Sequence, residues 1–351
     1  MWFKQKTTKK SSVANINHCQ SQLASIHSNG VELAMAELLN YQNKTALIDL
    51  SARQNVHGQM SGNYLSRTKG RGMEFDEVRH YQTGDDIRAI DWRVTARTGK
   101  THTKLFREEL ERPVLIATDL SASMHFGSQL LFKSIQAAHL ASLVAWHAKN
   151  RGDRLGGIVF NQHDHLELKP RSRKEGVLHY LHALTTLHQN QHKQQYLEKQ
   201  ENIASDDSNN NYFSDNCARI RQIAKPGSLV YLITDAQQIK HVNSSQQQDA
   251  LRHLTQISQH CELVVCLIKD SLEQALPDSK IKLNVTLTDG ENRQQFTLGD
   301  KATAVTYQQQ ASIANEQCEQ ALIKAGARVI NLSSGQTLEQ QLKNGEQFCS
   351  K

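Results

Sequence analysis

Two aspartates that follow apolar segments are the residues of this sequence best suited to hold a metal ion. Asp119 ends the apolar run over residues 114–118, and Ser121 and Ser123 follow it in the order Asp-Leu-Ser-Ala-Ser. A carboxylate and two hydroxyls at this spacing can converge on one point, and hard oxygen ligands favour Mg²⁺ or Mn²⁺ over zinc. The alternative interpretation is a helix cap, a common role for Asp and Ser.

Asp235 ends a second apolar segment, over residues 228–234. Ligands of parallel sheets bind at the carboxyl ends of the strands, so neighbouring parallel strands would bring Asp235 to the same edge as Asp119. The sequence therefore predicts a site in which Asp119, Ser121 and Ser123, with Asp235 acting through water, bind Mg²⁺ or Mn²⁺ and leave one position open.

The elements that must position these residues alternate along the chain from residue 113 onward. Short apolar strands are expected over residues 114–119, 154–160, 228–235, 262–268 and 327–331. Helical periodicity lies between them, over residues 129–150, 175–188, 217–224, 250–260 and 308–325. This alternation predicts an α/β fold, with a mostly parallel sheet covered by helices on both faces. A hairpin-like segment is expected over residues 281–298, with Asp289-Gly290 near its turn.

The composition suggests three regions. Residues 1–60 are polar with one helical pattern, residues 61–112 form a β-rich extension, and residues 113–351 form the α/β domain. A polar segment near residues 190–212 is expected to be a mobile insertion in that domain.

Charge and hydropathy limit the classes of protein. The 351 residues include 41 Lys and Arg against 35 Asp and Glu, a net charge of +6 that permits an acidic partner but does not indicate nucleic-acid binding. No apolar stretch is long enough to span a membrane, and no secretory signal is expected. The six cysteines are scattered, which favours reduced thiols in a cytoplasmic protein.

Several separated motifs resemble known families. Asp119-Leu-Ser-Ala-Ser-Met124 resembles the metal-ion-dependent adhesion site of the von Willebrand factor A fold, and Asp235 stands where that fold has its last acidic ligand. The motifs that resemble domain of unknown function family 58 lie on both sides: Gly70-Arg-Gly-Met-Glu-Phe75, residues 79–88, Ile90-Asp-Trp92, Ala96-Arg97, Phe126-Gly127, Lys133 and Gly152-Asp-Arg154.

The resemblance implies a von Willebrand factor A-like core behind an N-terminal β-rich extension, and association with a MoxR-type AAA+ ATPase that acts on a client protein. Two departures stand out. Many relatives carry two membrane helices near the N-terminus, and this chain is expected to have none. The adhesion site also normally takes a Thr from a third loop. Here that loop falls in the polar segment, where Ser214, Asn211 or Thr186 are the candidates.

The stretch from Gly84 to Trp92 has two interpretations. In the first it is a contact surface near the metal edge, with Arg88 and Arg93 offering forked donors to a partner's carboxylate. In the second it is a structural turn shaped by Gly84 and Asp85, in which Asp91 pairs with a nearby Arg while Ile90 and Trp92 are buried.

No nucleophilic elbow, Walker A loop or dinucleotide fingerprint is present. We therefore expect a cytoplasmic protein-interaction module rather than an enzyme. The alternatives are a Mg²⁺- or Mn²⁺-dependent phosphoester hydrolase and a basic nucleic-acid-binding protein.

Overall fold

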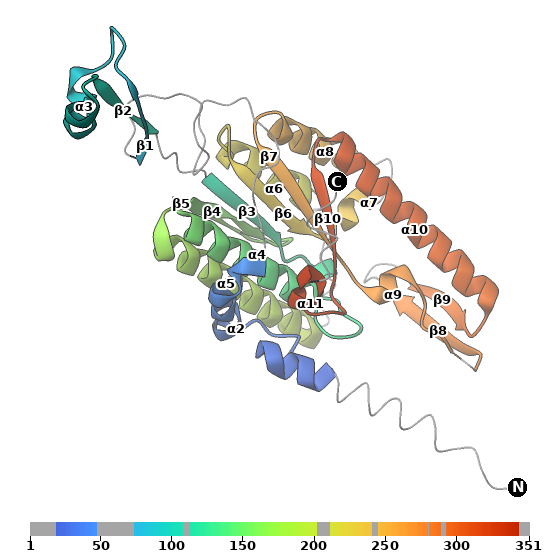
Figure 1. The fold of residues 1–351 in the computed structure, drawn as a ribbon. Helices are drawn as coiled ribbons and strands as arrows, with labels where there is room; N and C mark the ends of the chain where they lie inside the picture. The colour runs from blue at the N-terminus through green and yellow to red at the C-terminus, as the bar shows by residue number, and fades with distance from the viewer. Residues whose placement is uncertain are drawn as a thin grey trace, which may run out of the picture.

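A computed structural model of the chain describes residues 19–47, 74–107, 113–201, 211–240, 245–279, 281–288 and 293–343. At its centre is a six-stranded sheet of order β10-β7-β6-β3-β4-β5 (Figure 1). Its strands are β3 (Pro113–Asp119), β4 (Arg154–Phe160), β5 (His165–Arg171), β6 (Leu229–Thr234), β7 (Glu262–Lys269) and β10 (Arg328–Ser333). Only β5 runs antiparallel to its neighbour. The predicted α/β fold with a mostly parallel sheet is confirmed.

The central strands are apolar on both sides because helices cover both faces of the sheet. Along β3, Val114 and Ile116 belong to one core cluster, whereas Leu115 and Ala117 belong to the other. This alternation follows from the period of two along a strand. A strand buried on both faces shows continuous apolar character instead of alternation, which is why these segments could be recognised in the sequence.

One face is covered by α4 (Lys133–Arg151), α5 (Arg173–Glu201) and the N-terminal segment, which includes α2 (Met35–Leu39) and two short 3₁₀ helices, Asn40–Asn43 and Thr45–Leu47. The last helix, α11 (Leu338–Lys343), adds Leu338 to the same core. Helix α4 is buried over 15 of its 19 residues because it is enclosed by the sheet, by α5 and by the N-terminal segment. The Leu38 carbonyl accepts hydrogen bonds from Ser142 Oγ at 2.7 Å and Trp146 Nε1 at 3.3 Å, so these two polar groups of α4 are satisfied inside the core.

The other face is covered by α6 (Tyr212–Ile223), α8 (Ser245–Ser258) and α10 (Lys301–Lys324), with the short α7 (Gln237–Lys240) beside them. In Figure 1 these helices lie on the side of the sheet opposite α4 and α5. A two-stranded hairpin, β8 (Leu283–Thr288) and β9 (Arg293–Leu298), lies between α9 (Ser271–Gln274) and α10. The predicted hairpin is present, and its predicted turn at Asp289-Gly290 falls outside the described residues.

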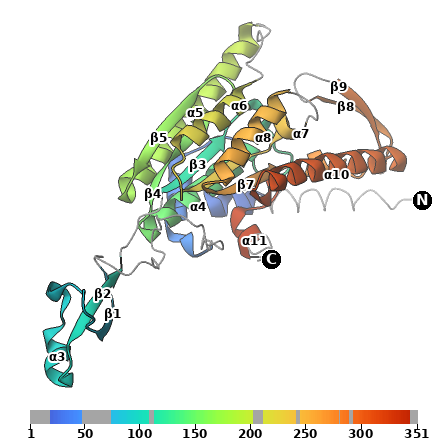
Figure 2. The ribbon, with the colours of Figure 1, turned by 90° about the horizontal axis from the view of Figure 1, so that it is seen from above.

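A separate small unit precedes the sheet. Strands β1 (Glu74–His80) and β2 (His102–Arg107) pair antiparallel, and the 3₁₀ helix Ile87–Ala89 and α3 (Trp92–Thr98) lie between them. In Figures 1 and 2 this unit lies away from the six-stranded sheet. Of the family-like motifs, Gly70-Arg-Gly-Met73 lies outside the described residues.

Several predicted helix boundaries were wrong, and α6 and α8 each begin five residues earlier than predicted. Helix α5 does not end near residue 188 but continues to Glu201, into the segment expected to be an insertion, and residues 202–210 lie outside the described residues. Gln, Lys, Glu and Leu all have good helix propensity, so a polar composition does not end a helix. Helix α10 begins earlier than predicted, at Lys301, because the Asp300 carboxylate caps it through the Thr303 amide.

Within the described residues no helix combines the length and apolar character needed to cross a bilayer. Five cysteines lie in the described part of the chain, and none of these five is in a disulfide.

Candidate functional site

Asp119 joins the ends of two neighbouring strands. It is the last residue of β3 and is 1% exposed. Its Oδ1 accepts a hydrogen bond from the Ser121 amide at 2.9 Å, and its Oδ2 accepts one from the Thr234 hydroxyl at 2.7 Å. Because Thr234 ends β6, which pairs with β3, this second bond fixes the two carboxyl ends against each other. Asp119 is therefore held rigidly at the carboxyl edge of the sheet.

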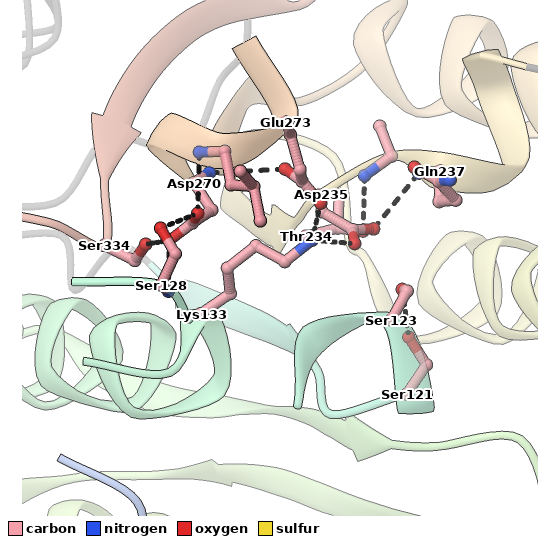
Figure 3. A network of polar contacts seen from close by, with 12 residues as sticks. Ser121, Ser123, Ser128, Lys133, Thr234, Asp235, Gln237, Asp270, Glu273 and Ser334 are labelled. Carbon is pink, nitrogen blue, oxygen red and sulfur yellow. Dashed lines mark hydrogen bonds and ion pairs between the residues drawn. The ribbon is translucent and has the colours of Figure 1, made fainter. Parts of the chain in front are cut away.

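The two predicted hydroxyl ligands converge. Ser121 is buried and Ser123 is half-buried, and their Oγ atoms are 3.2 Å apart. Figure 3 shows the two side chains pointing toward one another. The helix-cap interpretation does not hold for the long helix, since α4 begins only at Lys133 with Phe132 at its N-cap. The loop instead leads into a short 3₁₀ helix, Ala122–Met124, whose N-cap residue is Ser121.

Asp235 lies at the same edge, as predicted, but with a partner that the sequence did not suggest. Its Oδ2 lies 2.8 Å from Nζ of Lys133, and its Oδ1 accepts a hydrogen bond from the Gln237 amide at 3.1 Å. The same Lys133 ammonium lies 2.5 Å from Oε1 of Glu273, at the start of the short helix after β7. Figure 3 shows Lys133 reaching from α4 to both carboxylates.

The two aspartates have opposite electrostatic environments. Burial, together with the negative charge of Asp235, raises the pKa of Asp119 to about 6. Burial alone would also raise the pKa of Asp235, but the adjacent Lys133 ammonium, with the charge of Lys240, lowers it. The pKa of Lys133 is raised: burial opposes this, but the charges of Asp235 and Glu273 outweigh burial. Asp235 is thus compensated by a cation, whereas Asp119 is not.

The third loop contributes a residue that the sequence did not suggest. Burial, together with the negative charges of Asp119 and Asp235, raises the pKa of Tyr212, and the proximity of its hydroxyl to Ser121 and Gln238 opposes that rise. Ser214 lies two residues further along α6, half-buried, and no hydrogen bond joins it to Asp119 or the two serines in the described residues. No periodicity signals Tyr212, because its role depends on how α6 docks.

A second polar network stabilises the adjoining strand ends. Asp270 follows β7 and is fully buried. Its carboxylate accepts hydrogen bonds from the Ser128 amide and hydroxyl at 2.9 and 2.5 Å, from the Ser334 hydroxyl at 2.7 Å and from the Leu272 amide at 2.9 Å (Figure 3). The network connects the loop after β3 to the ends of β7 and β10. Ser128 and the Asp119–Ser123 segment belong to the same loop, so the network also anchors that loop.

Gly127 allows this loop to fold back tightly. A Cβ on Gly127 would collide with the carbonyl of Leu131, so any larger residue would displace the segment that leads into α4. The Phe126-Gly127 motif therefore has a steric role next to the acidic edge.

The structure does not place Arg88 and Arg93 at the acidic edge. Both are exposed on the small N-terminal unit, which joins β3 at its amino end, opposite Asp119. The expectation of a contact surface near the metal edge is therefore wrong in its location. In the described residues neither guanidinium forms an ion pair.

The structural-turn interpretation of this stretch is correct in part. Gly84 has φ +108°, and Asp85 binds Arg79 and the Gln82 amide, as a shaped turn requires. Asp91 caps α3, and its charged neighbour is Lys104 at 3.7 Å rather than an Arg. The expectation that Trp92 is buried is wrong.

Trp92 is 67% exposed and Ile87 is 66% exposed, and both side chains lie close in sequence to Arg88 and Arg93. The apolar character of Trp92 led to the expectation of burial, but a two-stranded unit has too little interior to enclose a tryptophan.

The fold and this edge together define a class: an α/β protein whose parallel sheet ends in a cluster of carboxylates and hydroxyls. The family model named "Protein of unknown function DUF58" matches residues 77–319, more than half of the chain. The chain belongs to this family, and the match covers the N-terminal unit as well as most of the sheet domain.

Similar proteins include uncharacterized proteins of Mycobacterium bovis (strain ATCC BAA-935 / AF2122/97) and of Mycobacterium tuberculosis (strains CDC 1551 / Oshkosh and ATCC 25618 / H37Rv). Each is 34% identical over 114 residues, which is 32% of this chain and 36% of the relative. The match thus spans little more than a third of the length of these relatives.

Proposed function

We propose that the chain is a protein-interaction module that binds a partner through Mg²⁺ or Mn²⁺ at the acidic edge of its sheet. The observation that carries this proposal is the convergence of Asp119, Ser121 and Ser123 beside Asp235, with the Asp119 charge uncompensated. In this proposal the core is von Willebrand factor A-like, and the module works in the cytoplasm.

The residues at the edge fit a hard divalent cation. Every candidate donor is oxygen, as Mg²⁺ and Mn²⁺ prefer. A buried carboxylate without a cationic partner is unstable, as the raised pKa of Asp119 reflects, and a bound cation would relieve that instability. The described residues contain no cluster of three or more His, Cys, Asp or Glu arranged to hold a metal, so the serine hydroxyls are essential to the proposed ligand set.

Each residue has a distinct role in this proposal. Asp119 binds the ion directly with Ser121 and Ser123, Asp235 acts through water, and the Tyr212 hydroxyl orients Ser121. The ion would supply one open coordination position, which an Asp or Glu of the partner fills. Ser123, the most accessible of the proposed ligands, marks the side from which a partner would approach.

The resemblance of the motifs supports a MoxR-type AAA+ ATPase as partner, with the module coupling the ATPase to a client protein. The second contact in this proposal is the N-terminal unit. Its exposed Trp92 and Ile87 lie beside Arg88 and Arg93, whose guanidiniums form no ion pair within the described residues. Trp and Arg dominate the binding energy of many interfaces. Because the charges of Arg88 and Arg93 are not paired in the part of the chain that the structure describes, we propose that an acidic surface of the ATPase binds to this part of the N-terminal unit.

The alternatives have weaker support. A phosphoester hydrolase needs a general base near the ion, and the nearest additional carboxylate networks in the described chain are committed: Asp270 accepts four hydrogen bonds and Glu273 pairs with Lys133. A nucleic-acid-binding role depended on the net charge of +6 and on the Arg-rich segment over residues 67–112, of which residues 67–73 and 108–112 lie outside the described residues.

Titration calorimetry with Mg²⁺ and Mn²⁺ tests the proposal. We expect saturable binding to the wild-type protein and none to Asp119→Ala. Asp300→Ala, which removes a surface helix cap far from the edge in sequence, is the control and should bind as the wild type does. Binding that is unchanged in Asp119→Ala would refute the proposed site.

A further inference from the structure

Lys133 brings a permanent cation to the acidic edge. It is one of the largest fully buried side chains of the described chain, at 1% exposure, and it begins α4. Its ammonium lies 2.8 Å from Asp235 and 2.5 Å from Glu273. Transfer of an ammonium group out of water is strongly unfavourable unless it is paired, so this position requires a carboxylate partner, and the edge supplies two.

Of the two aspartates, only Asp235 is paired with a cation in the described part of the chain. In the described residues no Lys, Arg or His forms an ion pair with Asp119, whose oxygens are held by the Ser121 amide and the Thr234 hydroxyl. Asp235, by contrast, contacts Lys133 directly. A divalent ion at Asp119 would therefore lie next to an ammonium that already uses the neighbouring carboxylate.

We infer that Lys133 is a tethered cation that shares Asp235 with the divalent ion and thereby sets the affinity of the site. This inference rests on the proposed cation site. The ammonium weakens ion binding in two ways, because it repels the ion and because it neutralises Asp235 beforehand. Glu273 has the opposite effect. It offers the ammonium a second partner, so that Asp235 can turn toward the ion without leaving Lys133 unpaired.

The inference predicts that two variants change the Mn²⁺ affinity in opposite directions. Removal of the Glu273 charge leaves Lys133 bound to Asp235 alone, so Glu273→Gln should weaken Mn²⁺ binding about three- to tenfold. Removal of the ammonium leaves two adjacent buried carboxylates, so Lys133→Met should strengthen Mn²⁺ binding about tenfold or more. A merely structural ion pair would not produce opposite effects.

The chain offers a matched control for Glu273. Glu319 pairs with Lys269 at 2.6 Å, and its side chain is 29% exposed, against 28% for Glu273. Glu319→Gln therefore removes an equivalent charge from an equivalent ion pair, and Mn²⁺ binding should not change.

The experiment is Mn²⁺ titration calorimetry on the full chain, with circular dichroism to establish that each variant is folded. A double variant completes a mutant cycle: in the Lys133→Met background, Glu273→Gln should have no further effect, since Glu273 acts through Lys133. If Lys133→Met does not fold, the comparison of Glu273→Gln with Glu319→Gln still tests the inference, because Glu273 is partly exposed.

The outcomes separate this inference from the proposed function. Asp119-dependent binding with the same affinity in wild type, Glu273→Gln and Lys133→Met would overturn the inference and leave the cation site in place. Asp119-dependent binding in Lys133→Met where the wild type shows none would support the inference in its strongest form. No Mn²⁺ binding in any variant would overturn the cation site and the inference together.

Discussion

The Thr234 hydroxyl donates a hydrogen bond of 2.7 Å to Oδ2 of Asp119, although the two residues are 115 positions apart in the chain. It joins the ends of β6 and β3 at the point where the negative charge is least compensated. The same hydroxyl accepts a hydrogen bond from the Ala236 amide at 3.0 Å, so it connects the carboxylate to the segment that carries Asp235.

Thr234→Val removes this hydroxyl and keeps the shape of the side chain. The Asp119 carboxylate then loses one of its two hydrogen bonds in a buried site, and we expect the free energy of unfolding to fall by about 1–3 kcal/mol. Urea denaturation followed by circular dichroism measures the change. Thr185→Val is the control: Thr185 is also buried, but its hydroxyl bonds only to carbonyls of its own helix, and the loss should be smaller.

Asp119→Asn should have opposite effects with and without a divalent ion. In EDTA the substitution removes a buried charge that repels Asp235, so the melting temperature at pH 7 should equal or exceed that of the wild type. In 10 mM Mg²⁺, a concentration of about 100 times an assumed Kd, the wild type should gain about 2.7 kcal/mol while the variant gains none. Equal Mg²⁺ effects on both proteins would argue against the site.

Asp270 should make stability depend on pH in the acid range. Burial opposes ionisation of Asp270, but the hydrogen bonds from Ser128, Ser334 and Leu272 outweigh it and lower its pKa. A carboxylate with a lowered pKa stabilises the folded state above its usual range, and that stability is lost as the pH falls through the lowered pKa.

Asp270→Asn should therefore reduce the free energy of unfolding at pH 7 by about 1–3 kcal/mol, and the difference from wild type should narrow below pH 4. Urea denaturation at pH 7, 5 and 3 provides the test. A difference that stays constant across this range would show that the Asp270 charge does not contribute.

Trp92 and its neighbouring arginines should matter for association rather than for folding. Because Trp92 is 67% exposed, Trp92→Ala should change the free energy of unfolding by less than about 0.5 kcal/mol. We expect Trp92→Ala and the double variant Arg88→Ala/Arg93→Ala to weaken binding of the purified MoxR-type ATPase from the same organism at least tenfold.

Ile313→Ala is the control for this surface, since Ile313 is 55% exposed on α10, in the other part of the molecule. Surface plasmon resonance with immobilised ATPase measures all three. Undiminished binding in both variants of the N-terminal unit would remove this surface from the proposed function.

The sequence was sufficient for the five parallel strands of the sheet and for the convergence at their edge, but it did not predict β5, the antiparallel edge strand, whose residues are mostly exposed. A buried parallel strand is a continuous apolar run, and the polar residue that ends it lies at the carboxyl edge, so the pattern of residues alone places Asp119 and Asp235 together. The same pattern does not predict that the Lys133 side chain is buried at this edge. A lysine at a helix start is normally exposed, and its burial depends on Asp235 and Glu273, which lie 102 and 140 residues away in the chain.

The positions of Tyr212 and Trp92 could not be predicted from the sequence either. The candidates for the third-loop ligand were Ser214, Asn211 and Thr186, but the docking of α6 places Tyr212 near Ser121 instead. Trp92 was assigned to an interior on its apolar character, although the small unit around it has no interior of that size. Both outcomes depend on tertiary packing that composition does not encode.

The burial of α4 along nearly its whole length has a consequence for hydrogen exchange. Its backbone amides should be among the slowest in the molecule to exchange with deuterium, since they open only when the core does. Glu273 lies instead on a four-residue helix. The Lys133–Glu273 ion pair thus links α4, which opens only when the whole domain unfolds, to α9, which can open locally. A change in the charges at the acidic edge should therefore alter the deuterium exchange rate of the α9 amides, while the α4 amides remain protected.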